Sequence, residues 1–186
     1  MKTKTERVYW SYPDDVYALT DAQTRPGLSS ALVPPSMRSL VGSGPRVERL
    51  HTVMIVVHDE NGAPVGMETE IEIFPLPGEP RLMEVFLTLS LPGRGALFVR
   101  ELKLYGESRR DKIWDEVKAT GIPWTGELET VFTAGPLEGN RGVVLAGTGE
   151  FEGATGTQYQ TSTLRKITPE GWENHLCENF DLSWAT

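Results

Sequence analysis

The chain has 186 residues, the size of a single domain, and its 18 basic and 26 acidic residues give a net charge of −8. This balance argues against a nucleic-acid-binding protein, which would carry a basic patch, and against electrostatic binding to anionic membranes. With 39% apolar residues the chain is too apolar to be disordered, while its 19 glycines and 13 prolines favour many turns over long helices.

Several further classes of protein are excluded. Cys177 is the only cysteine, so neither an intrachain disulfide nor a cysteine-based metal site is possible. The longest apolar run, residues 53–57, is far shorter than the roughly 20 residues of a membrane-spanning helix. No apolar segment follows the basic N-terminus, as a secretory signal would require. We therefore expect a soluble, cytoplasmic protein that binds neither nucleic acid nor membranes.

Residues 1–46 are expected to hold one N-terminal strand and a long connection within a single domain spanning residues 1–186. The strand is predicted near residues 7–12. Residues 26–46 contain four prolines, three glycines and five serines and show no periodicity. Long loops of this kind are often functional. Because Leu28, Leu32 and Met37 make this one apolar, we expect it to act as a lid over a binding cavity.

From residue 47 onward the pattern is that of β-strands separated by turns. Residues 47–58 end in a Val/Ile-rich run, Asn61-Gly62 is a strong hairpin signal, and residues 65–74, 82–91 and 96–105 form further strands. One short amphipathic helix is predicted near residues 109–119, before Gly121. More strands are predicted at residues 127–133, 141–147, 157–167 and 172–184. Seven or eight short strands with little helix favour an all-β sandwich or closed barrel, and closure would remove exposed strand edges.

Three candidate motifs do not hold. The run Gly142–Gly149 resembles a dinucleotide-binding turn, but the third glycine is missing, since Glu152 stands there, and strand-like sequence follows instead of a helix. His58 lies at a predicted turn, and no second group has metal-ligand spacing, so no metal is expected. The serines show no nucleophile-elbow pattern, which argues against a serine hydrolase.

Three glutamates, Glu68, Glu70 and Glu72, share one face of the strand at residues 65–74. One interpretation is a solvated sheet face. The other places them inside a barrel, where clustered carboxylates repel, their pKa values rise, and one of them is suited to act as a general acid or base.

The segment Leu145–Gly156 resembles the glycine-rich strand pair of plant allene oxide cyclases and is similar to a Gly-Thr-Gly-x-Phe run of dirigent proteins. The hairpin at residues 58–66 is similar to that of small bacterial barrel cyclases of polyketide biosynthesis. The resemblance covers about residues 47–165. It implies a closed eight-stranded antiparallel β-barrel with one short helix, a hydrophobic cavity, no cofactor, and assembly into homodimers or homotrimers. Plant cyclases carry an acidic residue on their first strand where this chain has Trp10, so plant-type epoxide chemistry is not expected.

Matching the hairpin also implies which side chains face inward. The implied catalytic residues are Glu68, Glu70, Glu101, Lys103 and Tyr105. The implied substrate-binding residues are Val53, Ile55, Val57, Glu72, Met83, Val85, Leu87 and Val99. Phe98, Leu102 and Leu104 would face outward and form a subunit contact.

Our leading hypothesis is a cofactor-independent cyclase or isomerase acting on an apolar intermediate of polyketide or terpenoid type. Lys103 would hold one carboxylate ionised while another stays protonated, and Tyr105 would donate a hydrogen bond to a carbonyl. A second hypothesis is a non-catalytic binding barrel of lipocalin-like or dirigent type, which needs no titrating residue. A third is a structural β-protein with a filled core.

Overall fold

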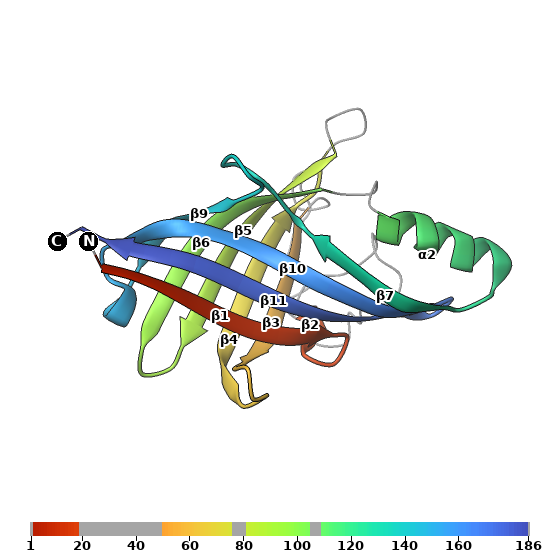
Figure 1. The fold of residues 1–186 in the computed structure, drawn as a ribbon, viewed down its shortest axis with the longest axis horizontal. Helices are drawn as coiled ribbons and strands as arrows, with labels where there is room; N and C mark the ends of the chain where they lie inside the picture. Colours follow the sequence, from red (N-terminus) through yellow and green to blue (C-terminus); the bar gives the residue numbers. More distant parts are fainter. Residues whose placement is uncertain (1, 19–49, 76–80, 105–108, 186) are drawn as a thin grey trace, which may run out of the picture.

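The computed structural model describes residues 2–18, 50–75, 81–104 and 109–185. Nearly all of this is β-structure in one antiparallel sheet (Figure 1). The strands are β1 (Lys2–Tyr12), β2 (Val16–Ala18), β3 (Leu50–His58), β4 (Pro64–Ile73), β5 (Leu82–Leu91), β6 (Gly95–Leu104), β7 (Trp124–Val131), β8 (Thr133–Gly135), β9 (Gly142–Gly147), β10 (Ala154–Thr168) and β11 (Gly171–Trp184). One α-helix, α2 (Arg109–Thr120), and a 3-10 turn, η3 (Gly149–Phe151), complete the described elements.

Eight of the described strands close into a barrel, in the order β1-β11-β10-β9-β6-β5-β4-β3, with β3 meeting β1 again. The predicted eight-stranded antiparallel barrel with one short helix is therefore confirmed. Closure between β1 and β3 rests on the pair Tyr9 and His58, supported by a 3.0 Å contact between His58 Nε2 and Asp15 Oδ1. The remaining strands β2, β7 and β8 pair with β3, β10 and β6 respectively.

The alternating pattern of the hairpins explains the barrel wall. In β4, β5 and β6 every second residue is buried, as a strand with one face on the core requires. The register between β4 and β5 pairs Glu70 with Leu87, and that between β5 and β6 pairs Leu87 with Val99. These neighbours lie on the same inner face, so one choice of register determines the inner face of all three strands.

Both termini lie at one end of the barrel (Figure 1), and apolar side chains fill this end. Its apolar core includes Val57, Leu91, Phe151 and Phe180. The Arg94 guanidinium lies 5.3 Å from the Phe151 ring and donates hydrogen bonds to both carboxylate oxygens of Glu6 at 2.8 Å. This ion pair covers the apolar core at the barrel end, which we call the apolar plug. The strand predicted near residues 7–12 is β1 and begins earlier, at Lys2. Its charged first half forms ion pairs at the closed end of the barrel.

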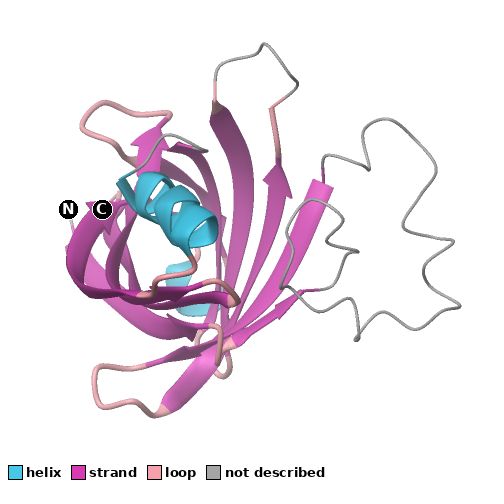
Figure 2. Cartoon of the chain, turned by 90° about the vertical axis from the view of Figure 1, so that its right-hand side faces the viewer, coloured by secondary structure: helices cyan, strands magenta, loops and turns pink. Residues whose placement is uncertain are grey.

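The opposite end is extended by the long strands β10 and β11, by β7 and by α2 (Figure 1). Figure 2 views this end with the α2 helix in front. Val117 of α2 is buried in a small second core with Leu128, Leu164 and Ile167. The Gly121 N–H bonds the Val117 carbonyl at 2.8 Å with Gly121 at φ +70°, the expected C-terminal glycine of a helix. The expected lid, residues 26–46, and Tyr105 lie outside the described residues. In the described part of the chain no helix is long and apolar enough to cross a membrane.

Candidate functional site

Midway along the barrel the inner face changes from apolar to ionisable. Inward positions of β4 and β6 hold the buried side chains of Glu68, Glu70, Glu72, Glu101 and Lys103. The structure thus places these predicted residues in the barrel interior rather than on a solvated sheet face. Glu178 of β11 joins them from across the barrel and is also fully buried. We call Glu68, Glu70, Glu101, Glu178 and Lys103 the inner ionisable cluster.

Lys103 is the cationic centre of this cluster. Its Nζ lies 2.8 Å from Glu70 Oε1 and 3.1 Å from Glu101 Oε1. The second oxygen of Glu101 accepts a 2.7 Å hydrogen bond from the Thr133 hydroxyl. Burial acts to lower the pKa of Lys103, but the negative charges of Glu101, Glu70 and Glu178 outweigh it and raise that pKa well above its usual value. Lys103 therefore stays protonated.

Two glutamines of β10 hold Glu178 in place. The side-chain amide of Gln158 donates to Glu178 Oε2 at 2.5 Å, and that of Gln160 donates to Oε1. Burial, followed by repulsion from Glu101, raises the pKa of Glu178 to about 8. At neutral pH this carboxyl is therefore mainly protonated.

Glu68 differs from its neighbours because neither of its oxygens has a hydrogen-bond partner among the described residues, although its side chain is 0% exposed. Burial, and then the charges of Glu178 and Glu70, raise the pKa of Glu68 well above its usual value. Burial also raises the pKa of Glu70, against the opposing charge of Lys103. A charged and unpartnered carboxylate at this depth would cost several kcal/mol, about the scale of an uncompensated buried charge, so Glu68 is held neutral.

In the described chain, one group of carboxyls is spaced closely enough to surround a metal ion. One oxygen each of Glu68, Glu70 and Glu178 lies within 4.8 Å of the others. We assign no metal to this group, because the ammonium of Lys103 already stands beside Glu70 as its counter-cation.

A cavity of about 90 Å³ opens above the cluster. Glu70 and Lys103 line it together with Gln160, while Glu68, Glu101 and Glu178 lie behind that lining. Its other walls are mixed apolar and polar: Trp10, Tyr12, Glu72, Met83, Leu104, Arg110, Phe132, Trp172, Asn174 and Leu176. This volume is small beside the roughly 300–1,000 Å³ of typical ligand pockets, so it accepts a small group rather than a whole polyketide.

Aromatic rings surround the mouth of this cavity. Tyr12 and Trp172 stack at 5.0 Å between ring centroids. The Arg110 guanidinium, at the start of α2, lies 4.9 Å from the Phe132 ring and 5.6 Å from that of Trp172. Trp114 meets Trp172 edge-on at 5.1 Å. The helix thus positions a cation and an aromatic wall at the entrance.

Most of the predicted substrate-binding residues lie in the apolar core and not at the cavity. Of the eight predicted substrate-binding residues, only Glu72 and Met83 line the cavity. Val85 packs with Met83 and Phe74, and the other five belong to the main apolar core: Val53, Ile55, Val57, Leu87 and Val99. They face inward as predicted, but they pack in one core with larger side chains such as Phe151 and Phe180.

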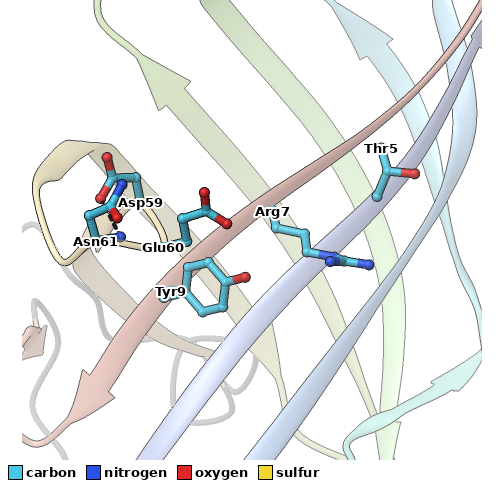
Figure 3. Close-up of a pocket in the computed structure, with 6 residues that line it drawn as sticks. All are labelled: Thr5, Arg7, Tyr9, Asp59, Glu60 and Asn61. Carbon is cyan, nitrogen blue, oxygen red and sulfur yellow. Dashed lines mark hydrogen bonds between the residues drawn. The ribbon is translucent and has the colours of Figure 1, made fainter.

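A further pocket lies on the outside of the barrel, between β1 and the turn that joins β3 to β4 (Figure 3). Tyr9 of β1 lies beside Glu60, whereas the Arg7 guanidinium points away from Glu60 (Figure 3). Asp59 accepts a hydrogen bond from the Asn61 backbone N–H at 2.9 Å. Its wall is mainly polar and shares no residue with the inner ionisable cluster. This pocket is a surface groove beside the place where β1 and β3 close the barrel.

The fold has counterparts among solved structures. The pterocarpan synthase dirigent protein PsPTS1 matches with a TM-score of 0.50 and 8% identity, over 100% of this chain and 97% of that one. The chain has a dirigent-like β-barrel fold. GePTS1, also a pterocarpan synthase dirigent protein, matches at 9% identity with a TM-score of 0.48, over 100% and 87% of the two chains. No protein-family model and no curated protein matches.

The dirigent-like barrel contains site residues that the sequence interpretation missed. Glu178, Gln158, Gln160 and Thr133 are all buried at the cluster. The signal for Glu178 was present, because it alternates with Leu176 and Phe180 along β11 and must share their inner face. Thr133 carried no such signal, since β8 has three residues and no period.

Proposed function

We propose that the protein is a cofactor-independent cyclase or isomerase acting on a small molecule with an apolar body and a carbonyl-bearing end. The observation that carries this proposal is the pairing of Glu70 and Lys103 at the floor of a cavity, backed by further buried carboxyls. A barrel core that served only stability would be more stable with apolar side chains, because the attraction within a buried ion pair rarely exceeds the free-energy cost of its desolvation. Perturbed ionisable groups in a cavity favour a catalytic role.

Each group has a chemical role in this proposal. The Lys103 ammonium donates a hydrogen bond to the substrate carbonyl, which stabilises the negative charge that develops there. The Glu70 carboxylate removes a proton from the adjacent carbon, and Glu70 in its acid form, after proton exchange with water, protonates another atom. The aromatic mouth holds the apolar body in a folded conformer, and this restriction lowers the entropic barrier to ring closure. Tyr105 remains a predicted hydrogen-bond donor.

The size of the cavity determines how such a substrate would bind. About 90 Å³ admits the carbonyl end, while the apolar body lies among Trp10, Tyr12, Phe132 and Trp172. The substrate is therefore amphiphilic, rather than uniformly apolar as the sequence alone led us to expect.

The test is proton exchange at carbon. The purified protein is incubated in D₂O with a panel of unsaturated ketones of terpenoid and polyketide type, and deuterium uptake and ring products are followed by NMR and mass spectrometry. We expect uptake for at least one compound and a loss of roughly 100-fold in Glu70→Gln, the usual size for one acid–base group. Exposed Glu138→Gln is the control and should retain the wild-type rate.

The second candidate is a binding barrel that orients a ligand without proton transfer. The dirigent-like fold favours it, because the solved structures it resembles are dirigent proteins. Compounds that bind with equal affinity to the wild type and to Glu70→Gln, and that take up no deuterium, would favour this candidate and contradict the enzyme.

A further inference from the structure

Glu68 is the one residue of the inner ionisable cluster that the proposed chemistry leaves unexplained. Glu70, Glu101 and Glu178 each accept a hydrogen bond from a named donor, namely Lys103, Thr133 and the two glutamines. Glu68 has no such donor among the described residues and does not line the cavity. A buried polar group without a partner normally costs about 1–3 kcal/mol, so its presence calls for a reason.

Among the residues that the structure describes, the proton acceptors near Glu68 are other carboxyls. On its own strand it faces Glu70, with Glu72 beyond. Lys103 and Glu101 approach from β6, Glu178 approaches from β11, and the neutral Gln158 and Gln160 come from β10. The strands paired with β4 bring only the apolar Ile55 and Leu89 opposite Glu68. The apolar plug with Phe151 and Phe180 separates it from water at the closed end.

The charges in this space cannot all be present together. Four carboxylates against the single ammonium of Lys103 would leave three negative charges uncompensated in a buried volume. Protons must therefore be held among the carboxyls. One oxygen of each of Glu68, Glu70 and Glu178 lies within 4.8 Å of the others, so a proton held by one carboxyl is close to the next.

We propose that Glu68, Glu70 and Glu178 share protons as a single store behind the cavity floor, and that Glu68 is a positioning residue that returns protons to Glu70. This inference rests on the proposed function. The step is a transfer from the Glu68 carboxylic acid to the Glu70 carboxylate, giving a Glu68 carboxylate and a Glu70 carboxylic acid, with no change in total proton number. Glu70 then acts as an acid without waiting for solvent. When it next takes a proton from substrate, the reverse transfer refills Glu68.

The experiment is a titration of the substrate-free protein whose glutamate carboxyls are labelled with ¹³C, followed by NMR from pH 4 to 10. In the wild type we expect Glu68, Glu70 and Glu178 to titrate together, with at least one carboxyl still protonated at pH 7. In Glu68→Gln the titrations of Glu70 and Glu178 should both move down by about one pH unit or more, because a titrating neighbour is gone. Exposed Glu138→Gln should move neither.

Three results would overturn the proposal: an unchanged Glu70 titration in Glu68→Gln, three independent carboxyls all ionised below pH 6, or shifts of these signals on adding MgCl₂ or CaCl₂, which would make the group a cation site. If Glu68→Gln does not fold, Glu178→Gln is titrated instead and Glu68 and Glu70 are observed. Because no substrate is present, this outcome is independent of deuterium uptake. If the carboxyl titrations are not coupled but deuterium uptake is observed, only the shared proton store is rejected. If the titrations are coupled but no compound takes up deuterium, the proposed enzymatic function is rejected.

Discussion

Lys103 is the residue on which the inner ionisable cluster depends. It lies at hydrogen-bond distance from Glu70 and Glu101, and the charges of Glu178 and Glu72 also act on it. Removing one partner of a buried ion pair destabilises a protein far more than replacing the whole pair by apolar side chains, because the remaining charge stays buried without compensation. Substitutions at this residue should therefore affect stability as well as activity.

We predict that Lys103→Met lowers the free energy of unfolding at pH 7 by about 3–5 kcal/mol. The matched control is Lys166→Met, since Lys166 is 2.8 Å from Glu173 but both side chains are solvent-exposed, and such a pair is worth at most about 1 kcal/mol. Urea unfolding of both variants measures the difference. Equal, small effects would mean that the carboxyls near Lys103 are already neutral.

The raised carboxyl pKa values also predict how stability changes with pH. The folded protein holds the Glu178 proton up to a pKa of about 8, whereas the unfolded chain releases it near 4.5. Between these values the folded state binds more protons, so stability falls as pH rises, by up to about 1.4 kcal/mol per pH unit for each such carboxyl. Urea unfolding at pH 5, 6, 7 and 8 should show this decline, and Glu178→Gln should make it shallower. A stability that rises from pH 5 to 8 would contradict the assignment.

At the level of single elements, the glycine-rich segment that resembled a family motif has a structural task. It connects β9, η3 and β10 at the closed end of the barrel and brings Phe151 into the core. Close backbone approach explains two of its glycines. A Cβ on Gly147 would lie 2.2 Å from the Phe151 carbonyl oxygen, and one on Gly156 would lie 2.1 Å from that of Asp181. The motif therefore has a structural role at the closed end of the barrel.

Gly147→Ala is predicted to destabilise the protein by about 1–3 kcal/mol or more, the range for forcing extra atoms into a packed site. Gly171→Ala is the matched control within the same sheet, because its added Cβ would meet nothing within 4 Å and the expected change is within about 0.5 kcal/mol. Thermal unfolding of the two variants provides the comparison. A Gly147→Ala protein as stable as Gly171→Ala would show that the closed end can rearrange.

On the scale of the whole molecule, the outer wall formed by β4, β5 and β6 carries six large exposed apolar side chains beside the Arg100–Glu84 ion pair. Its large exposed side chains, 37–45% accessible, are Met67, Ile71, Leu82, Phe86, Phe98 and Leu104. Ile71 lies opposite Phe86, and Leu82 lies opposite Leu104, so they form neighbouring pairs across the strands. Apolar groups gathered on one face indicate a contact with another molecule. Of the residues predicted from sequence for this contact, Phe98 and Leu104 are exposed and Leu102 is half-buried.

We propose that this wall joins copies of the chain, and we predict a homodimer or homotrimer at micromolar concentration by light scattering. The double substitution Phe86→Glu and Phe98→Glu should give a monomer, because it places charges on the shared apolar surface. Ile122→Glu changes an equally apolar and more exposed residue that follows α2, and it should leave the assembly intact. A wild-type protein that is monomeric throughout would reject the proposal.

Much of this architecture is determined by the sequence alone, because its signals are local. Alternation with a period of two, turns rich in Gly, Pro and Asn, and the helix ended by Gly121 depend only on neighbouring residues. They predicted most of the strands and the helix but left a sandwich or a closed barrel open, and the resemblance to dirigent proteins and barrel cyclases implied the eight-stranded barrel. The alternating pattern placed Glu68, Glu70 and Glu72 on one face of a strand, and the resemblance then implied that this face, with Glu101 and Lys103, points inward.

Tertiary structure alone decided which of these residues meet and which space stays open. Glu178 and Glu70 are more than 100 residues apart in the chain, and only barrel closure brings them within reach of each other. Nor does local sequence show that Glu68 lacks a partner. The inward valines and leucines were expected to line a cavity, but Phe151 of η3 and Phe180 of β11 pack against them in the core. Packing is a sum over side chains from all parts of the chain, so the position of the cavity follows from the closed barrel and from no single strand.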